Sequence, residues 1–425
     1  MKILFLSTAD ISGGAAIAAH RLFRHMVAEP GIEAEMLVQY KAGCDPQVRK
    51  PESDWGKLAT HLRMPLESLL VRKSYPRAQT SNFMPARLPD GLRRRIDAFA
   101  PDLLHVHWVG HSFLRPETLT GIRCPIVWTL HDMWALTGGC YYDGGCGRYT
   151  AACGQCPVLA STAQSDLSRK GVQRKREAWQ GLNLTLVSPS QWLASCARRS
   201  SIHPGRRVEV IPYGLNPETF RPWPKPVARE MLGLPPDAKL VLFGAAGVAD
   251  PRKGFAYLES ALGELREGTD VGLVVFGGHL QSSSLAASGI RIHVLGQLRD
   301  ELTTALAYAA ADIFVAPSLE DNLPNTVLEA AMCGTPVVAF RVGGIPDAIE
   351  QERHGLLVEP RDSAGLASAI RRLLRDDVLR VSLGRNARAK AERDYHPALQ
   401  VKRYTELYRE LLGFESQPLS KNEHS

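Results

Sequence analysis

Arg252 and Lys253 form a pair of cationic side chains with a clear chemical use. They stand in the sequence Asp-Pro-Arg-Lys-Gly at residues 250–254, after a strand predicted at residues 239–243 and before a helix start. A diphosphate placed there would meet two formal positive charges and the unpaired backbone N–H groups of a helix N-terminus. Taken alone, the pair is also consistent with two solvated cations in a surface loop.

Two carboxylates follow the strand predicted at residues 312–316 and could bind sugar hydroxyls. Asp321 is expected in a loop and Glu329 on the helix that follows, so both can face one ligand. Asn322 suits a helix cap, and Pro324 suits a first helical turn. Carboxylate oxygens that accept hydrogen bonds from vicinal hydroxyls are what a sugar or ribose site requires. The alternative is a capped helix in an ordinary β-α-β unit.

A glycine pair and a histidine mark two further strand ends. Gly13 and Gly14 follow the first predicted strand and open a helix, where a glycine backbone lets a phosphate approach the helix N-terminus. The segment lacks the complete Gly-x-Gly-x-x-Gly fingerprint, so it is also consistent with a tight turn. His131 lies at the C-terminal edge of the strand predicted at residues 126–130, where parallel sheets bind ligands. We therefore interpret it as a functional histidine.

Four cysteines gather in a short, glycine-rich stretch. Cys140, Cys146, Cys153 and Cys156 are spaced C-x5-C-x6-C-x2-C within 17 residues. Four thiolates this close could hold a tetrahedral structural zinc, although one pair alone has the tight C-x2-C spacing. Free thiols or a redox pair are the alternatives. No metal is expected in catalysis, because the sequence contains no Asp-x-Asp motif.

Short apolar strands alternate with helices along the chain, which is typical of parallel sheets covered on both faces. In the first half the predicted strands are residues 2–7, 35–39, 102–107, 126–130, 184–188 and 207–211. In the second half they are residues 239–243, 272–276, 291–295, 312–316 and 336–340. We expect an α/β protein with two Rossmann-like parallel-sheet domains that face each other across a cleft.

A stretch with five prolines at residues 211–226 breaks this alternation and predicts a linker. The C-terminal residues are helical in pattern, and their apolar face is expected to pack back on the first domain. The expected segments are an N-terminal domain at 1–211 with a cysteine-rich insertion at 138–157, a linker at 212–226, a C-terminal domain at 227–395, a crossover helix at 396–415 and a disordered tail at 416–425.

The formal net charge of +7 is unevenly distributed. Residues 1–215 contain 27 Lys and Arg against 17 Asp and Glu, a net of +10, whereas residues 216–425 contain 24 against 27, a net of −3. This favours an anionic partner for the first half. Nucleic acid is disfavoured, because no interleaved aromatic stripe accompanies the arginines. No apolar run is long enough to span a membrane, and we expect a cytoplasmic protein.

In this combination and order, the motifs resemble the retaining GT-B glycosyltransferases of family four over about residues 1–415. The closest likeness is to the branch of colanic-acid and other exopolysaccharide biosynthesis. It is carried by His131-Asp-Met-Trp134, the cysteine-rich stretch and Asp321-Asn-Leu-Pro-Asn-Thr-Val-Leu-Glu329. The resemblance implies transfer of a sugar from a nucleotide-diphosphate donor to a glycan acceptor, with retention of anomeric configuration, in the assembly of surface polysaccharide or lipopolysaccharide.

The resemblance also implies roles for individual residues. His131 would contact the donor sugar near the reaction centre, Lys253 would neutralise the diphosphate leaving group, and Asp321 would touch the transferred sugar. Glu329 would bind the nucleotide ribose. The donor-binding set that the resemblance implies is Gly13, Gly14, Arg252, Asn322, Leu323, Asn325 and Glu329.

Two positions depart from the family pattern. Gly247 stands where the family commonly has an arginine six positions before the lysine, and we expect Arg252 to take over that charge. Asp321 replaces a glutamate and is one methylene shorter, although Glu320 stands next to it. Neither departure removes the main phosphate-binding elements.

The basic first half bears on the acceptor. By the resemblance, a polyprenyl-diphosphate-linked or other glycan acceptor belongs there, and an anionic membrane would attract the chain to the inner face of the plasma membrane. Two alternatives stay open. A sugar-nucleotide epimerase or hydrolase of the same architecture would turn over without an acceptor, and a non-catalytic nucleotide-sugar-binding protein would not turn over at all.

Overall fold

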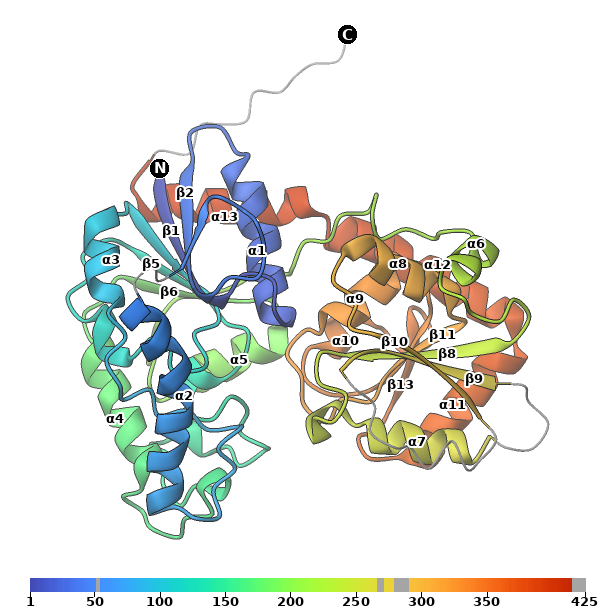
Figure 1. Cartoon of the computed structure of the whole chain (residues 1–425), viewed down its shortest axis with the longest axis horizontal. Helices are drawn as coiled ribbons and strands as arrows, with labels where there is room; N and C mark the ends of the chain where they lie inside the picture. The colour runs from blue at the N-terminus through green and yellow to red at the C-terminus, as the bar shows by residue number, and fades with distance from the viewer. Residues whose placement is uncertain (51–53, 266–270, 279–289, 415–425) are drawn as a thin grey trace. The chain divides into compact units, whose positions relative to one another are not determined.

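The computed structural model describes residues 1–50, 54–265, 271–278 and 290–414, and the chain divides into two compact units (Figure 1). Unit 1 comprises residues 1–188, 196–211 and those from 398 onward. Unit 2 comprises residues 189–195 and 212–397. In the described part of the chain, no helix is long and apolar enough to cross a membrane.

Unit 1 is built on a seven-stranded sheet in the order β3-β2-β1-β4-β5-β6-β7, and all of its neighbouring strands pair in parallel. The central strand β1 is buried along almost its whole length, as a parallel strand covered on both faces must be. The strands are β1 (Lys2–Ala9), β2 (Glu33–Tyr40), β3 (Val48–Arg49), β4 (Leu103–Val106), β5 (Ile126–Thr129), β6 (Leu184–Ser188) and β7 (Val208–Val210).

The C-terminal helix packs on unit 1, as predicted. Tyr404 and Tyr408 of this helix are fully buried and share a core cluster with Ile3 and Phe5 of β1. The Tyr404 hydroxyl lies 2.6 Å from Oγ1 of Thr129. The helices that contact this unit are α1 (Gly14–Val27), α2 (Asp54–Ser74), α3 (Leu92–Phe99), α4 (Leu167–Trp179), α5 (Gln191–Arg199) and α13 (Pro397–Leu411), the last drawn in red in Figure 1.

Unit 2 repeats the design with a six-stranded parallel sheet in the order β10-β9-β8-β11-β12-β13. Its strands are β8 (Lys239–Ala245), β9 (Val271–Gly277), β10 (Arg291–Gly296), β11 (Ile313–Ala316), β12 (Val337–Phe340) and β13 (Gly355–Val358). Its helices are α6 (Lys225–Met231), α7 (Phe255–Gly263), α8 (Glu301–Ala310), α9 (Asn325–Met332), α10 (Ile345–Ala348), α11 (Ser363–Arg375) and α12 (Asp377–Asp394). Both sheets place the central strand beside a topological switch point, the position at which open α/β sheets bind ligands.

The predicted α/β class with two Rossmann-like parallel sheets is confirmed, but two boundaries differ. Residues 189–195, predicted to belong to the N-terminal domain, pack with unit 2. The helix α6 begins at Lys225, inside the predicted linker. The predicted tail at 416–425 lies outside the described residues.

Candidate active site

A tight 3-10 turn at Pro251–Lys253 presents the two predicted cations at the end of β8. The Asp250 carboxylate caps this turn by accepting a hydrogen bond of 2.9 Å from the backbone N–H of Arg252. Gly254 follows with φ +71°, and a Cβ there would lie 1.8 Å from the carbonyl oxygen of Pro317. Only glycine permits this conformation and this close approach, so the turn is anchored to the loop after β11.

Lys253 and Asp321 form an ion pair across these two loops. Nζ of Lys253 lies 2.6 Å from Oδ2 of Asp321, and Nη1 of Arg252 lies 4.0 Å from the same oxygen. The Arg252 guanidinium also donates to the Glu320 carbonyl oxygen (3.0 Å) and to Asp250 (3.1 Å). Burial raises the pKa of Asp321, but the charges of Lys253 and Arg252 and the hydrogen bonds to it outweigh burial and hold the pKa below its usual value.

Two glycines hold the backbone of Asp321 and Asn322 from the other side. The Gly344 N–H donates to the carbonyl oxygen of Asn322 at 2.6 Å. A Cβ on Gly343 would lie 1.6 Å from the Asp321 carbonyl oxygen, and one on Gly344 would lie 2.2 Å from that of Asn322. The segment after β12 therefore needs glycine to support the Asp321 loop.

The prediction that Asn322 caps the following helix is wrong. The N-cap residue of α9 is Pro324, and Oδ1 of Asn322 instead accepts a hydrogen bond of 2.6 Å from the hydroxyl of Ser190. This contact and the hydrogen bond of 2.6 Å from the Gln191 backbone N–H to Asp347 join residues 189–195 to unit 2. The neighbouring Leu323 is buried, and Asn325 is the first residue of α9.

Glu329 lies on α9 as predicted and is 6% exposed. Its Oε2 accepts a hydrogen bond of 3.0 Å from the hydroxyl of Tyr308 on α8. The Tyr308 ring is fixed in turn by edge contacts with Phe276 and Phe314. The carboxylate therefore has a fixed direction before any ligand is present. We call Arg252, Lys253, Asp321, Asn322 and Glu329 the donor cluster.

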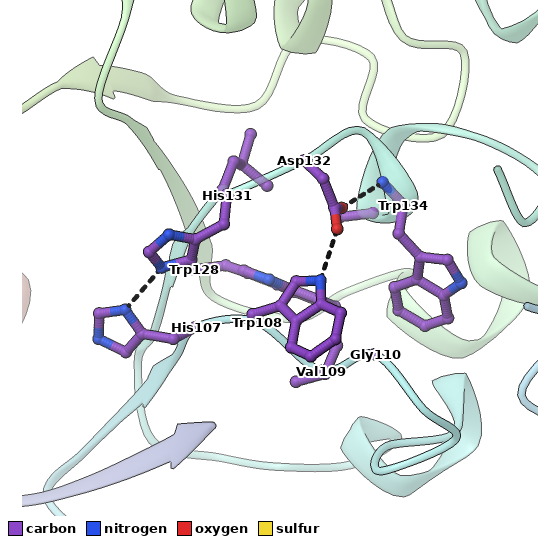
Figure 2. A pocket seen from close by; sticks show the side chains of 10 residues that line it. His107, Trp108, Val109, Gly110, Trp128, His131, Asp132 and Trp134 are labelled. Atoms are coloured by element: carbon purple, nitrogen blue, oxygen red, sulfur yellow. Dashed lines mark hydrogen bonds between the residues drawn. The ribbon is translucent and has the colours of Figure 1, made fainter. Parts of the chain in front are cut away.

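In unit 1, His131 lines a small pocket at the C-terminal ends of β4 and β5, which we call the histidine pocket (Figure 2). Nε2 of His131 lies 3.1 Å from Nδ1 of His107. Next to it, Asp132 accepts hydrogen bonds from Nε1 of Trp108 (2.6 Å) and from the backbone N–H of Trp134 (2.7 Å). These contacts fix both residues of the predicted His-Asp pair.

Both histidines are neutral. Burial lowers the pKa of His131 to about 3, and burial followed by the neighbouring histidines His105 and His131 lowers the pKa of His107. Nε2 of His107 has no hydrogen-bond partner among the described residues. An orphaned acceptor is more common than an orphaned N–H, so we assign the His107 proton to Nδ1, which donates to His131. His131 then carries its own proton on Nδ1 and can act as a neutral hydrogen-bond donor.

The glycine turn of unit 1 is as predicted at the start of α1. Gly13 is the N-cap residue, with φ +90° and no side-chain cap, and the first turn of α1 contains no acidic residue. The preceding loop is held by Asp10, whose carboxylate accepts hydrogen bonds from the backbone N–H groups of Ala42 (2.9 Å) and Gly43 (2.8 Å). The positive end of this helix dipole is therefore not offset by a side chain of the helix itself.

Some of the predicted site residues lie in contact with one another in the structure, and others lie at separate sites. Lys253, Arg252 and Asp321 meet directly, and Asn322 and Glu329 lie on the adjoining loop and helix. His131 belongs to unit 1 with the Gly13 turn. Cys140, Cys146, Cys153 and Cys156 line one pocket of unit 1 that is distinct from the histidine pocket.

Four supporting residues were not predicted: His107, Trp108, Ser190 and Tyr308. The first two could have been found, because β4 and β5 pair in parallel and His107 and His131 each lie just beyond the end of one of these strands. Ser190 and Tyr308 carry no such signal, since their partners lie 132 and 21 residues away on other elements.

Two family profiles match the chain. The profile described as Glycosyltransferase Family 4 matches residues 12–219, and that described as Glycosyl transferases group 1 matches residues 238–376. The first match falls largely on unit 1 and the second on unit 2. The chain is a glycosyltransferase of this group 1, family 4 type, with the two-domain GT-B architecture.

The chain is similar to several curated proteins that share one name. The D-inositol 3-phosphate glycosyltransferase of Pseudarthrobacter chlorophenolicus is 28% identical over 382 residues, 86% of this chain and 83% of the relative. The protein of the same name from Xylanimonas cellulosilytica is 37% identical over 203 residues, 44% of this chain and 48% of the relative. The colanic-acid branch that the motifs suggest stays a prediction.

Solved structures share the fold over nearly the whole chain. Sucrose-phosphate synthase from Thermosynechococcus elongatus aligns with a TM-score of 0.68 and 21% identity over 97% of this chain and 100% of that one. Anabaena HepE in complex with UDP-glucose aligns with a TM-score of 0.66 and 18% identity over 96% of this chain and 100% of that one. At this level of identity the likeness shows the fold alone.

Proposed function

We propose that the chain transfers a sugar from a nucleotide-diphosphate donor, bound at the donor cluster, to an acceptor hydroxyl. The observation that carries this proposal is the Lys253–Asp321 pair beside the start of α9. In the proposal Lys253 meets the diphosphate, Asp321 faces the transferred sugar and Glu329 binds the ribose. The UDP-glucose complex of HepE, a protein of the same fold, supports this donor class.

Lys253 and Arg252 would act when the bond between the anomeric carbon and the phosphate oxygen breaks. Negative charge then develops on the leaving diphosphate, and cations already in place stabilise it without reorganisation. Transfer proceeds with retention, because the acceptor hydroxyl arrives on the leaving-group side and a phosphate oxygen takes its proton. Neither a protein base nor a catalytic metal is then required. The neutral His131 would donate a hydrogen bond to a sugar hydroxyl.

The acceptor in this proposal bears a phosphate. The net charge of +10 over residues 1–215 favours an anionic acceptor. Relatives named D-inositol 3-phosphate glycosyltransferases support a soluble sugar or polyol phosphate. The motif resemblance supports a polyprenyl-diphosphate-linked glycan at the inner face of the plasma membrane, in surface polysaccharide assembly. Both acceptors carry a phosphate group in the same molecule as the hydroxyl that receives the sugar.

A screen in two stages tests this proposal. The melting temperature is measured with UDP-, GDP- and ADP-sugars, since a ligand at about 100 times its Kd adds about 2.7 kcal/mol of stability. The stabilising donor is then incubated with inositol phosphate or with lipid-diphosphate glycans in detergent, and products are identified by mass spectrometry. Donor cleavage at the same rate without any acceptor would indicate a hydrolase or epimerase. Donor binding without turnover in either pool would indicate a binding protein.

A further inference from the structure

The cysteine-rich loop of unit 1 contains a group of side chains that the proposed reaction does not use. Cys140 and Cys156 are buried with their sulfurs 3.9 Å apart, and the partly exposed Cys146 and Cys153 line the same pocket. We call these four residues the cysteine pocket. In a tetrahedral site with Zn–S bonds of about 2.3 Å, adjacent sulfurs lie about 3.8 Å apart. The buried pair therefore already has the spacing of two ligands of one zinc ion.

Two arginines stand around the cysteine pocket, which the carboxylate of Asp143 also lines. Arg148 donates to the carbonyl oxygen of Gly154 at 3.0 Å, and Arg169 donates to that of Cys153 at 3.2 Å. One zinc ion with four thiolate ligands carries a net charge of −2. Cations held in this way by the loop backbone would complement that charge.

The loop is ordered with little regular structure of its own. Between residues 141 and 160 it contains two 3-10 turns of three residues each, at Arg148–Thr150 and Pro157–Leu159. Cys153 and Gln155 adopt φ of 55° and 46°, in the left-handed region that disfavours side chains by about 1–2 kcal/mol each. A loop of this length without strands or helices needs another source of order.

We propose that Cys140, Cys146, Cys153 and Cys156 bind one structural zinc ion. In the described part of the chain no three such side chains already stand in coordination geometry. Metal binding therefore requires the partly exposed Cys146 and Cys153 to turn toward the buried pair. The bound ion would order the segment that follows His131. The alternative to a zinc site is a disulfide between Cys140 and Cys156, which would use only two of the four cysteines.

The test is the metal content of the full-length chain, produced with zinc in the medium and purified without chelator. We expect about one equivalent of zinc by mass spectrometry. The Cys146→Ser variant should contain less than about a fifth of that amount, whereas Cys124→Ser, a partly buried cysteine outside the pocket, should retain all of it. Cobalt substituted into the wild-type protein should give the absorption of a tetrahedral tetrathiolate, which keeps the test decisive if Cys146→Ser does not fold.

Three results would overturn the proposal. The first is a folded wild-type protein that contains no zinc and takes up none when zinc is added. The second is a Cys140–Cys156 disulfide in peptides of the protein purified under reducing conditions. The third is a cobalt spectrum without thiolate-to-metal charge-transfer bands. None of these readouts depends on sugar transfer. The zinc proposal can therefore fail while the proposed function holds, and the proposed function can fail while the zinc proposal holds.

Discussion

Nζ of Lys253 lies 2.6 Å from Oδ2 of Asp321, whose side chain is only 10% exposed. A pair this well shielded from water interacts more strongly than a surface ion pair, so it both joins the two loops and directs the ammonium group. In the proposed reaction a diphosphate competes with Asp321 for this charge. The pair therefore prepares Lys253 for an anion while keeping the site neutral without one.

Lys253→Ala should lower turnover far more than donor affinity. The lysine charge matters most as the leaving group departs, so kcat should fall by about 10²–10³-fold, while the Kd of the nucleotide-sugar changes by only a few fold. Steady-state kinetics and calorimetric titration measure the two effects. Lys239→Ala is the matched control, because Lys239 forms an exposed pair with Asp377. A kcat of Lys253→Ala equal to that of the wild type would refute the role.

Glu329→Ala should weaken binding of the donor and of the free nucleotide alike. Hydrogen bonds from ribose hydroxyls to a carboxylate contribute about 1.5–3 kcal/mol, so affinity should fall by about 10–100-fold. Tyr308→Phe keeps the carboxylate and removes only the hydroxyl that orients it, and should cost much less. Equal losses in the two variants would show that Glu329 supports the fold rather than the ribose.

Gly254→Ala should destabilise the protein more than Gly233→Ala. Both glycines have positive φ, but a Cβ at Gly233 meets nothing within 4 Å, whereas one at Gly254 would lie 1.8 Å from the carbonyl oxygen of Pro317. Gly233→Ala should therefore cost about 1–2 kcal/mol of backbone strain alone. Gly254→Ala adds the displacement of the Lys253 turn, and turnover should fall with it. Denaturant unfolding and kcat test this, and equal effects of both variants would contradict the anchoring role of Gly254.

The free energy of unfolding should decrease as the pH is lowered below about 6.5, the ordinary pKa of histidine. Burial lowers the pKa of His131 and of His203 to about 3, so the unfolded chain binds protons that the folded chain does not. Each such histidine reduces the unfolding free energy by up to about 1.4 kcal/mol per pH unit in this window. The effect is absent above the unfolded pKa, where the imidazole is neutral in both states.

His203→Gln isolates one of these contributions. Nε2 of His203 lies 3.0 Å from the carbonyl oxygen of Ala135, and the glutamine amide can replace that donor. The variant should be less stable than the wild type at pH 8, and the difference should shrink as the pH falls toward 5. Unfolding midpoints across this range measure it. A stability difference that does not change with pH would show that His203 titrates normally in the folded protein.

The fold was predictable because its central strands are continuous apolar runs between turn residues, as in residues 2–7 and 312–316. The elements that were missed carry weak signals. The strand β3 has two residues, too few to show a period, and α2 contains Pro65, which normally argues against a helix. The position of residues 189–195 depends on hydrogen bonds to residues far along the chain, Asn322 and Asp347.

The charged members of the donor cluster were predictable from their type and local spacing, as with Lys253 after β8 and Glu329 on α9. Their partners were not. The direct pairing of Lys253 with Asp321 links residues 68 positions apart, and it depends on glycines whose role appears only when the loops are close. Asn322 was assigned to a cap because its type suits one, whereas tertiary contacts with Ser190 decide its position.

Comparison of nucleoside diphosphate and monophosphate binding tests the central claim most directly. If Lys253 contacts the terminal phosphate of the leaving group, the wild type should bind the diphosphate at least about tenfold tighter than the monophosphate of the same base, equivalent to about 1.4 kcal/mol. Lys253→Ala should reduce that ratio several-fold, with monophosphate affinity unchanged, while Arg252 still contributes. A ratio that is unchanged by the substitution would contradict the contact between Lys253 and the terminal phosphate.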